Sequence, residues 1–213
     1  MLFHPSFVSI LEPLDSRRLL AADFVFAGVN KAGVLRLVGT ADADHYIVTA
    51  GAASVTVDRN GAVLAFSPSK VNGVVFDGGG GNDFVELRDF DLRSTLNGDA
   101  GNDTLYGGSY RDTINGGVGA DLLVGGSQDD VIHGNGGKDR IFGNAGRDRL
   151  FGEAGNDRIN AGPDNDVVDA GRGNDTIAFV SGDDTLFGGA AIDTGLDLGS
   201  LVSTFPPDGI ENL

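Results

Sequence analysis

The chain of 213 residues contains no cysteine, and this absence excludes both disulfide bonds and thiolate metal sites. It also lacks an apolar run approaching the roughly 20 residues that a membrane-spanning helix needs, so we expect no membrane span. Outside a reducing compartment, a chain without cysteine needs another means of crosslinking its fold. Bound metal ions are the candidate for this crosslinking role.

Basic residues are few, because 15 Lys and Arg stand against 31 acidic residues and leave a net charge of −16. This excess opposes compaction of the metal-free chain and argues against nucleic acid as a partner. Glutamate is also scarce: only four of the acidic residues are glutamate, and the other 27 are aspartate. The short aspartate side chain holds its carboxylate close to the backbone carbonyls of a tight turn, which suits a hard cation such as Ca²⁺.

Catalytic signatures are missing from the sequence. Histidine occurs three times, and neither an HExxH motif nor a G-x-S-x-G elbow is present. The acidic pairs Asp129/Asp130 and Asp183/Asp184 could mimic a glycosidase couple, but each contains an aspartate that a repeat explains. No EF-hand loop can be aligned either. We therefore predict that the chain is not an enzyme.

What the sequence does have is an aspartate at every ninth position over its second half. Small residues precede each aspartate and an aliphatic residue follows two places later, as in GGVGADLLV at residues 116–124. A strict short period predicts a solenoid, whose units are too small to bury a core alone and must stack on neighbours. The eleven positions are Asp103, Asp112, Asp121, Asp130, Asp139, Asp148, Asp157, Asp166, Asp175, Asp184 and Asp193.

With this aspartate at position six of the unit, position eight is aliphatic in ten successive units, and only Gly195 breaks the column. One obligate apolar position between two tolerant ones predicts a three-residue strand whose middle side chain points inward. The Gly-rich residues before it predict a turn. Two units of this kind would make one flat coil of 18 residues, and stacked coils would form two parallel sheets. The aliphatic residues are Leu105, Ile114, Leu123, Ile132, Ile141, Leu150, Ile159, Val168, Ile177 and Leu186.

In such a stack every second aspartate lies on the same edge, roughly 4.8 Å from the next. Carboxylates at this spacing would repel each other unless a cation lay between them. A Ca²⁺ between successive turns would remove the repulsion, taking carboxylates and turn carbonyls as its ligands.

The unit resembles GGxGxDxUx, the nonapeptide of hemolysin-type (RTX) calcium-binding repeats. The resemblance covers residues 98–195 continuously, with an isolated match, GGGGNDFVE, at residues 78–86. It implies an all-β fold, a right-handed parallel β-roll with Ca²⁺ in its turns, and an extracellular location, secreted or on the cell surface. The four pairs of neighbouring aspartates on each edge, from Asp103/Asp121 to Asp157/Asp175 and from Asp112/Asp130 to Asp166/Asp184, indicate about eight ions. The metal-binding residues that it implies are the aspartates above together with Asp83, and the position-four glycines Gly101, Gly119, Gly137, Gly155 and Gly173.

Position four separates the two edges of the predicted roll. The odd edge carries the five glycines just named, with Asp103, Asp121, Asp139, Asp157 and Asp175. The even edge carries Tyr110, Gln128, Gly146, Asp164 and Gly182 at position four. A Cβ at a position that needs a glycine conformation costs stability and distorts the carbonyls around an ion. We therefore expect the odd edge to bind calcium more tightly.

Composition divides the chain into four segments. We expect a leader or sorting segment at 1–22, a β-rich N-terminal cap at 23–97, the calcium-binding roll at 98–195 and a C-terminal cap or tail at 196–213. The leader contains LEPLDSRRLLAAD, which resembles the LEPR-XLL motif of exported, repeat-bearing bacterial proteins. The cap contains short strand patterns at VLRLVG, HYIVTA, SVTVDR, AVLAFS and GVVFDG.

Residues 39–47, GTADADHYI, look like a decayed repeat with Asp44 in the ligand position. An ordinary strand and turn also explains this stretch, and we favour that interpretation.

The function indicated by the sequence is calcium binding coupled to folding, in a structural or adhesive role. Two alternatives stay open: the C-terminal folding or secretion module of a larger secreted enzyme, and an adhesin that binds an extracellular polysaccharide or a cell surface. The adhesin would use outward side chains, either the arginines Arg140, Arg149 and Arg158 or the aromatics Tyr106, Phe142 and Phe151.

Overall fold

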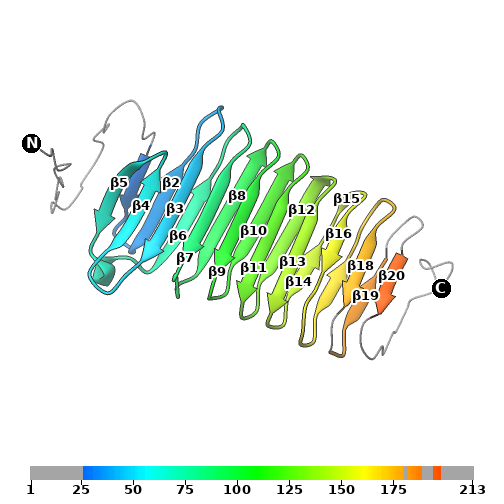
Figure 1. Cartoon of the computed structure of the whole chain (residues 1–213). Coiled ribbons are helices and arrows are strands. Elements are labelled where there is room, and N and C mark those ends of the chain that lie inside the picture. Colours follow the sequence, from blue (N-terminus) through cyan, green and yellow to red (C-terminus); the bar gives the residue numbers. More distant parts are fainter. Residues whose placement is uncertain (1–25, 180–181, 189–193, 198–213) are drawn as a thin grey trace, which may run out of the picture.

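The computed structural model describes residues 26–179, 182–188 and 194–197. Strands lie side by side along an elongated body, from β1–β5 at the N-terminal end to β19 and β20 at the other (Figure 1). The expected leader at 1–22 and the expected ligand Asp193 lie outside the described residues.

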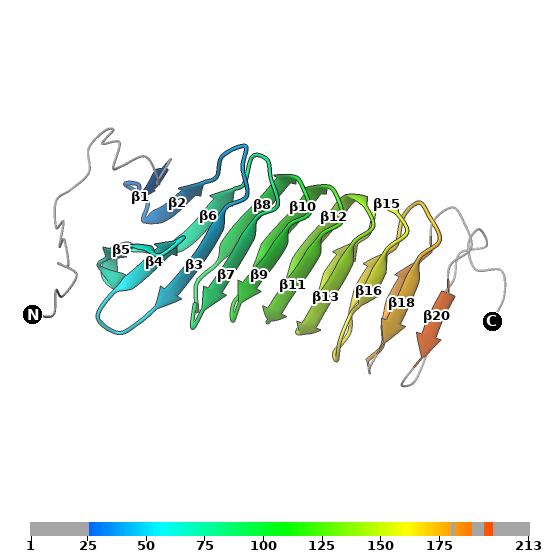
Figure 2. The same ribbon diagram turned by 45° about the horizontal axis from the view of Figure 1, so that its top comes forward.

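The described strands form two sheets of ten strands each, which Figure 2 shows as two rows along the body. The first sheet contains β1 (Phe26–Val29), β2 (Val34–Val38), β6 (Gly73–Asp77), β8 (Ser94–Ala100), β10 (Thr113–Val118), β12 (Val131–Gly137), β14 (Arg149–Phe151), β17 (Val167–Asp169) and β19 (Thr185–Phe187) in that spatial order, with β15 (Ala154–Gly155) beside β12. The second contains β20 (Thr194–Asp197), β18 (Thr176–Phe179), β16 (Arg158–Asn160), β13 (Arg140–Ala145), β11 (Leu122–Ser127), β9 (Thr104–Gly108), β7 (Phe84–Arg88), β3 (His45–Ala50), β4 (Val55–Arg59) and β5 (Ala62–Phe66).

Within the repeats, neighbouring strands of each sheet are parallel. Ile114 of β10 pairs with Ile132 of β12, and Leu123 of β11 pairs with Ile141 of β13. Each partner lies two units further along the chain, so one coil holds two nonapeptides and successive units alternate between the sheets. The predicted parallel β-roll is therefore confirmed.

The position-eight aliphatic side chains form the core between the two sheets. Those from Leu105 to Leu150 are completely buried, and those from Ile159 to Leu186 are at most 6% exposed. Flanking side chains such as Arg140 and Arg149 point to solvent. Full burial of an aliphatic side chain contributes about 1.5–3 kcal/mol, and each coil contains two of them.

The segment before the repeats forms longer coils on the same two sheets. β2 pairs with β6 and β3 pairs with β7, both in parallel. The antiparallel hairpin β4–β5 continues the second sheet beyond β3 and accounts for the longer coil. Strand β8 (Ser94–Ala100) crosses the division expected at residue 97, and both sheets continue across it.

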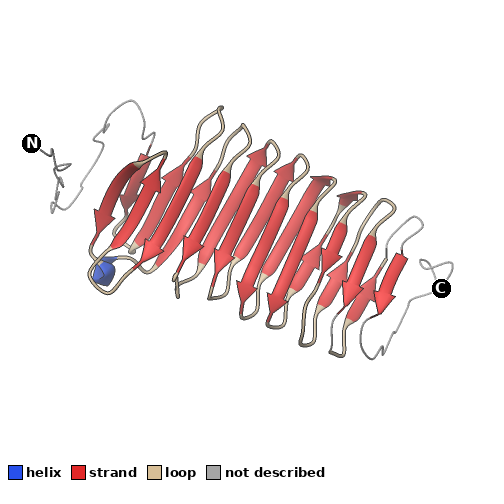
Figure 3. Ribbon diagram, in the orientation of Figure 1, coloured by secondary structure: helices blue, strands red, loops and turns tan. Residues whose placement is uncertain are grey.

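The five strand patterns expected in this segment are confirmed as β2 to β6. Its core is wider than that of the repeats, because it contains the buried aromatic side chains of Tyr46, Phe76 and Phe90. Strands dominate the described residues, in which the 3₁₀ turn η1 (Pro68–Lys70) is the one helical element (Figure 3). Within these residues no helix is long and apolar enough to span a membrane.

Candidate metal centre in two columns of aspartate

The position-six aspartates stack into two columns, one along each edge of the roll. The odd column consists of Asp83, Asp103, Asp121, Asp139, Asp157 and Asp175, and the even column of Asp112, Asp130, Asp148, Asp166 and Asp184. Except for Asp184, whose burial is intermediate, all of them are only 1–2% exposed. Each lies directly before a strand, so the pairing of the strands brings the carboxylates together as the sequence predicts.

One carboxylate oxygen of each column member is held by the backbone of the previous coil. The N–H of Asp103 donates to Oδ1 of Asp121 at 2.7 Å, and the N–H of Asp121 donates to Oδ1 of Asp139 at 2.9 Å. The same bond recurs along both columns at 2.7–2.9 Å. This ladder fixes the orientation of every carboxylate and directs its second oxygen into the turn.

That second oxygen, Oδ2, is buried and has no hydrogen-bond partner among the described residues in nine column members. A buried polar atom without a partner costs free energy, and a buried carboxylate costs more unless a cation compensates it. These nine oxygens are therefore the strongest indication that the turns are built around ions. The nine residues are Asp83, Asp103, Asp112, Asp121, Asp130, Asp139, Asp148, Asp157 and Asp166.

All of these Oδ2 atoms except that of Asp166, whose unit has Ala161 instead, lie against a glycine at position one of their own unit. A Cβ on Gly98 would lie 2.3 Å from Oδ2 of Asp103 and 2.5 Å from the carbonyl oxygen of Gly116, one coil later. The missing side chain thus leaves a carboxylate oxygen and a carbonyl oxygen beside the same α-carbon. Sequence reasoning overlooked these glycines, although their repetition at position one was visible. They are Gly78, Gly98, Gly107, Gly116, Gly125, Gly134, Gly143 and Gly152.

The electrostatics of the columns also favour a cation. Burial, the largest cause, raises the pKa of the Asp130 carboxyl to about 8, and the charges of Asp112 and Asp148 act in the same direction. Burial likewise raises the pKa of Asp139 and of Asp166 to about 7. Without a counter-charge these carboxylates resist ionisation, whereas a bound cation would stabilise their charged form.

The described residues contain no cluster of three acidic or histidine side chains able to hold a metal alone. An ion here must therefore take part of its shell from backbone carbonyls. Calcium accepts six to eight oxygen ligands in flexible geometry and combines carboxylates with carbonyls. The donor set of carboxylate Oδ2 and turn carbonyls fits calcium.

The predicted position-four glycines lie where consecutive turns approach most closely. A Cβ on Gly137 would lie 1.5 Å from the carbonyl oxygen of Gly119, and the φ of Gly137 is 149°. At the same position on the even edge Gln128 and Asp164 take φ values of 69° and 85°. The backbone of those two turns therefore differs from that of the odd edge, as a side chain there requires.

The acidic pair Asp129/Asp130 makes structural contacts in addition to those within the column. Oδ2 of Asp129 pairs with Arg111 at 2.8 Å, and its Oδ1 accepts from the backbone N–H of Arg147 at 3.2 Å. Asp130 belongs to the even column. Both carboxylates of the pair therefore take part in contacts between coils.

Asp44 belongs to the odd column, so our preference for an ordinary strand and turn at residues 39–47 was wrong. Its N–H donates to Oδ1 of Asp83 at 2.8 Å, as each later member donates to its successor. The hairpin between the two residues hides this relationship in the sequence by lengthening the coil to 39 residues.

The outward arginine and aromatic side chains are divided between the two faces. Arg140 and Phe142 lie on β13 of the second sheet, with the guanidinium carbon 5.6 Å from the ring centre. Arg149 and Phe151 form the equivalent pair on β14 of the first sheet, at 5.8 Å. Arg158 on β16 and Tyr106 on β9 also lie on the second sheet, so that face gathers two of the three arginines and two of the three aromatic side chains.

Comparison with known proteins agrees with the geometry. The chain matches the RTX calcium-binding nonapeptide repeat over residues 75–88, 97–132, 115–150, 142–177 and 181–194. No match was found among curated proteins.

Proposed function

Because the chain belongs to the RTX calcium-binding nonapeptide repeat family, we propose that it is a secreted or cell-surface scaffold whose roll folds when it binds Ca²⁺. The observation that supports this most directly is the series of buried Oδ2 atoms without a partner among the described residues. Successive members of one column would hold each ion, with their Oδ2 atoms and the turn carbonyls as the ligands. The roll would then hold about eight ions.

The expected contribution of these ions is large compared with the stability of a domain. At about 1 mM Ca²⁺ and a Kd of about 0.1 mM, each site adds about 1.4 kcal/mol. About eight sites would add about 11 kcal/mol, which is comparable to the whole free energy of unfolding of a typical domain. At cytosolic calcium this contribution nearly vanishes, and repulsion within the columns keeps the repeats open. The roll would therefore fold only after the chain has been exported from the cytosol.

Circular dichroism of the full chain tests the proposal. Millimolar Ca²⁺ should produce the β signal of the repeats, EGTA should abolish it, and Mg²⁺ should substitute poorly because it requires compact octahedral geometry. Equilibrium dialysis would count the ions. A β signal that is the same in EGTA and in Ca²⁺ would refute the coupling of folding to calcium.

An adhesive role for the same roll is the alternative, because Arg140, Arg158, Tyr106 and Phe142 share the second sheet. Binding to a glycan array would distinguish it from a scaffold role. The same roll would serve as the folding module of a larger secreted enzyme, and the calcium dependence would be the same in that case.

A further inference from the structure

The odd column begins with a carboxylate whose surroundings differ from those of all later members. Asp44 is 2% exposed and, through its N–H, joins the hydrogen-bond ladder at Asp83. A Cβ on Gly39 would lie 2.9 Å from Oδ2 of Asp44 and 2.1 Å from the carbonyl oxygen of Gly78. The same arrangement surrounds the odd-column carboxylates from Asp83 to Asp157, so Asp44 occupies a complete column position.

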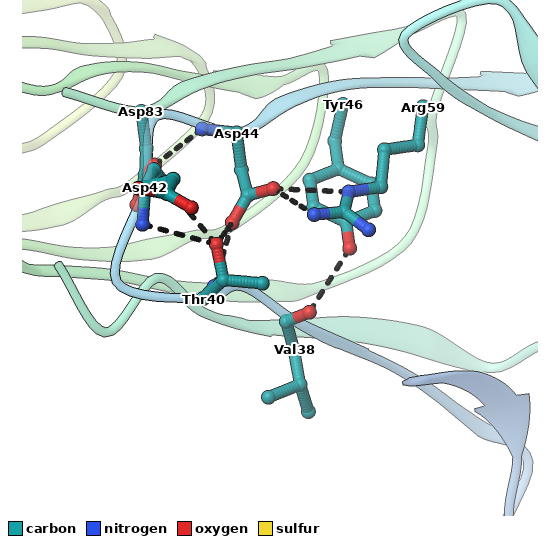
Figure 4. Close-up of polar contacts among 7 residues, drawn as sticks. All are labelled: Val38, Thr40, Asp42, Asp44, Tyr46, Arg59 and Asp83. Atoms are coloured by element: carbon teal, nitrogen blue, oxygen red, sulfur yellow. Dashed lines mark hydrogen bonds and ion pairs between the residues drawn. The ribbon is translucent and has the colours of Figure 1, made fainter. Parts of the chain in front are cut away.

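Both oxygens of Asp44 nevertheless have protein partners (Figure 4). Oδ1 accepts from Nε of Arg59 at 3.0 Å and also from Nη2 of the same guanidinium. Oδ2 accepts from the backbone N–H of Thr40 at 2.6 Å and from its hydroxyl at 3.1 Å. In Asp83, the next member, Oδ2 has no partner within the described part of the chain.

The guanidinium is a buried and permanent positive charge. Arg59 is 6% exposed, and the pairing of β4 with β3 places it opposite Tyr46. The ring of Tyr46 lies 5.5 Å from the guanidinium carbon, and its hydroxyl donates to the carbonyl of Val38 at 3.0 Å. The arginine is thus held in place by packing, and its charge does not depend on the concentration of any solute.

A calcium ion beside Asp44 would meet this fixed charge at close range and would find both carboxylate oxygens occupied. The surrounding coils also have more core than the repeats, since they contain the buried aromatic rings of Tyr46, Phe76 and Phe90. Charge compensation and packing are therefore both provided by the protein in this part of the roll.

We propose that Arg59 replaces calcium at the first position of the odd column. Residues 34–88 then fold without calcium, and their folded strands are available for the repeats to stack on. The inference rests on the proposed function, in which the later column members need calcium. Residues 34–88 then act as the template on which the calcium-dependent coils assemble, starting at Asp83 and Asp103.

Hydrogen exchange followed by mass spectrometry on the full chain tests this inference in EGTA and in millimolar Ca²⁺. In EGTA the wild type should protect residues 34–88 and leave residues 98–187 unprotected. Arg59→Met should lower the protection of residues 34–88 in EGTA by about 100-fold, because it leaves a buried carboxylate without its counter-charge. Calcium should restore the protection, with one additional ion bound. Unchanged protection in EGTA would overturn the inference.

Two further variants separate charge compensation from a general loss of folding. Asp44→Asn/Arg59→Met removes both charges and should keep residues 34–88 protected in EGTA, even if Arg59→Met alone does not fold. Loss of protection in the double variant would overturn the inference. Arg36→Met is the matched control, because Arg36 lies in the same region and forms an exposed pair with Asp77 at 2.8 Å. It should behave as the wild type does.

The proposed function is judged separately, by the response of residues 98–187. If the repeats were protected in EGTA, calcium-coupled folding would fail, while the effect of Arg59→Met on residues 34–88 would still decide the role of the arginine.

Discussion

The backbone N–H of Asp121 donates to Oδ1 of Asp139 at 2.9 Å, while Oδ2 of Asp139 is buried without a partner among the described residues. One oxygen thus aligns successive coils and the other remains for an ion. Because the same carboxylate does both, calcium affinity and coil stacking should change together when the turn is altered.

The close approach between turns at position four gives the first prediction. Gly137→Ala would place a Cβ 1.5 Å from the carbonyl oxygen of Gly119 at a φ of 149°, so the turn must deform at a cost of about 1–3 kcal/mol. The calcium midpoint of folding, followed by circular dichroism, should rise. Gly136→Ala is the matched control, since its Cβ would lie 3.8 Å from its nearest neighbour, the carbonyl oxygen of Gly117. Equal midpoints for the two variants would contradict the prediction.

Acidity should act in opposite directions on the metal-free and the calcium-bound protein. Burial raises the pKa of Asp130 to about 8 and of Asp139 to about 7, from an ordinary value of 3.8. The folded metal-free roll therefore binds more protons than the unfolded chain. Its stabilisation by these groups is complete below the unfolded pKa and is lost as the pH rises through the folded values.

The metal-free chain should consequently gain β signal when the pH is lowered from about 8 to about 5. Calcium binds the ionised carboxylates, so the calcium concentration needed for folding should rise over the same change. Circular dichroism at both pH values, in metal-free buffer and during calcium titration, measures the two trends. A metal-free β signal that increases with pH would show the sign to be wrong.

The thin core gives a third prediction. Ile114 is completely buried, and Ile114→Ala should lower the free energy of unfolding in saturating calcium by about 2–5 kcal/mol. The neighbouring Thr113 is only half-buried, and Thr113→Ala should change it by about 0.5 kcal/mol or less. Urea denaturation measures both values. A small effect of Ile114→Ala would mean that the ions, and not the aliphatic column, hold the coils together.

The sequence was sufficient for the repeats because their structure depends on a short and strict period. The spacing of Asp121 and Asp139 places both on one edge, and the spacing of Leu123 and Ile141 places both in the core. The same counting would have shown that Phe142 and Phe151, nine residues apart, lie on opposite sheets.

Asp44 could not be placed in this way, because its position depends on contacts that are distant in the sequence. The hairpin β4–β5 separates Asp44 from Asp83, and it brings Arg59 to the carboxylate only through the antiparallel pairing of β3 with β4. Periodicity contains no information about either contact. The turn glycines at position one, such as Gly98, were visible in the sequence, but their proximity to Oδ2 follows from three-dimensional packing.

The last prediction compares the two edges. Asp139→Ala and Asp130→Ala each remove a carboxylate whose Oδ1 accepts from the preceding column member, at 2.9 Å and 2.8 Å respectively. They differ in the residue at position four, which is Gly137 with a φ of 149° in one unit and Gln128 with a φ of 69° in the other. The odd edge should therefore bind calcium more tightly, and Asp139→Ala should raise the calcium midpoint of folding more than Asp130→Ala.

Calcium titrations of the two variants, followed by circular dichroism, compare these midpoints directly. An equal or larger shift for Asp130→Ala would show that the conformation at position four does not control the strength of the sites.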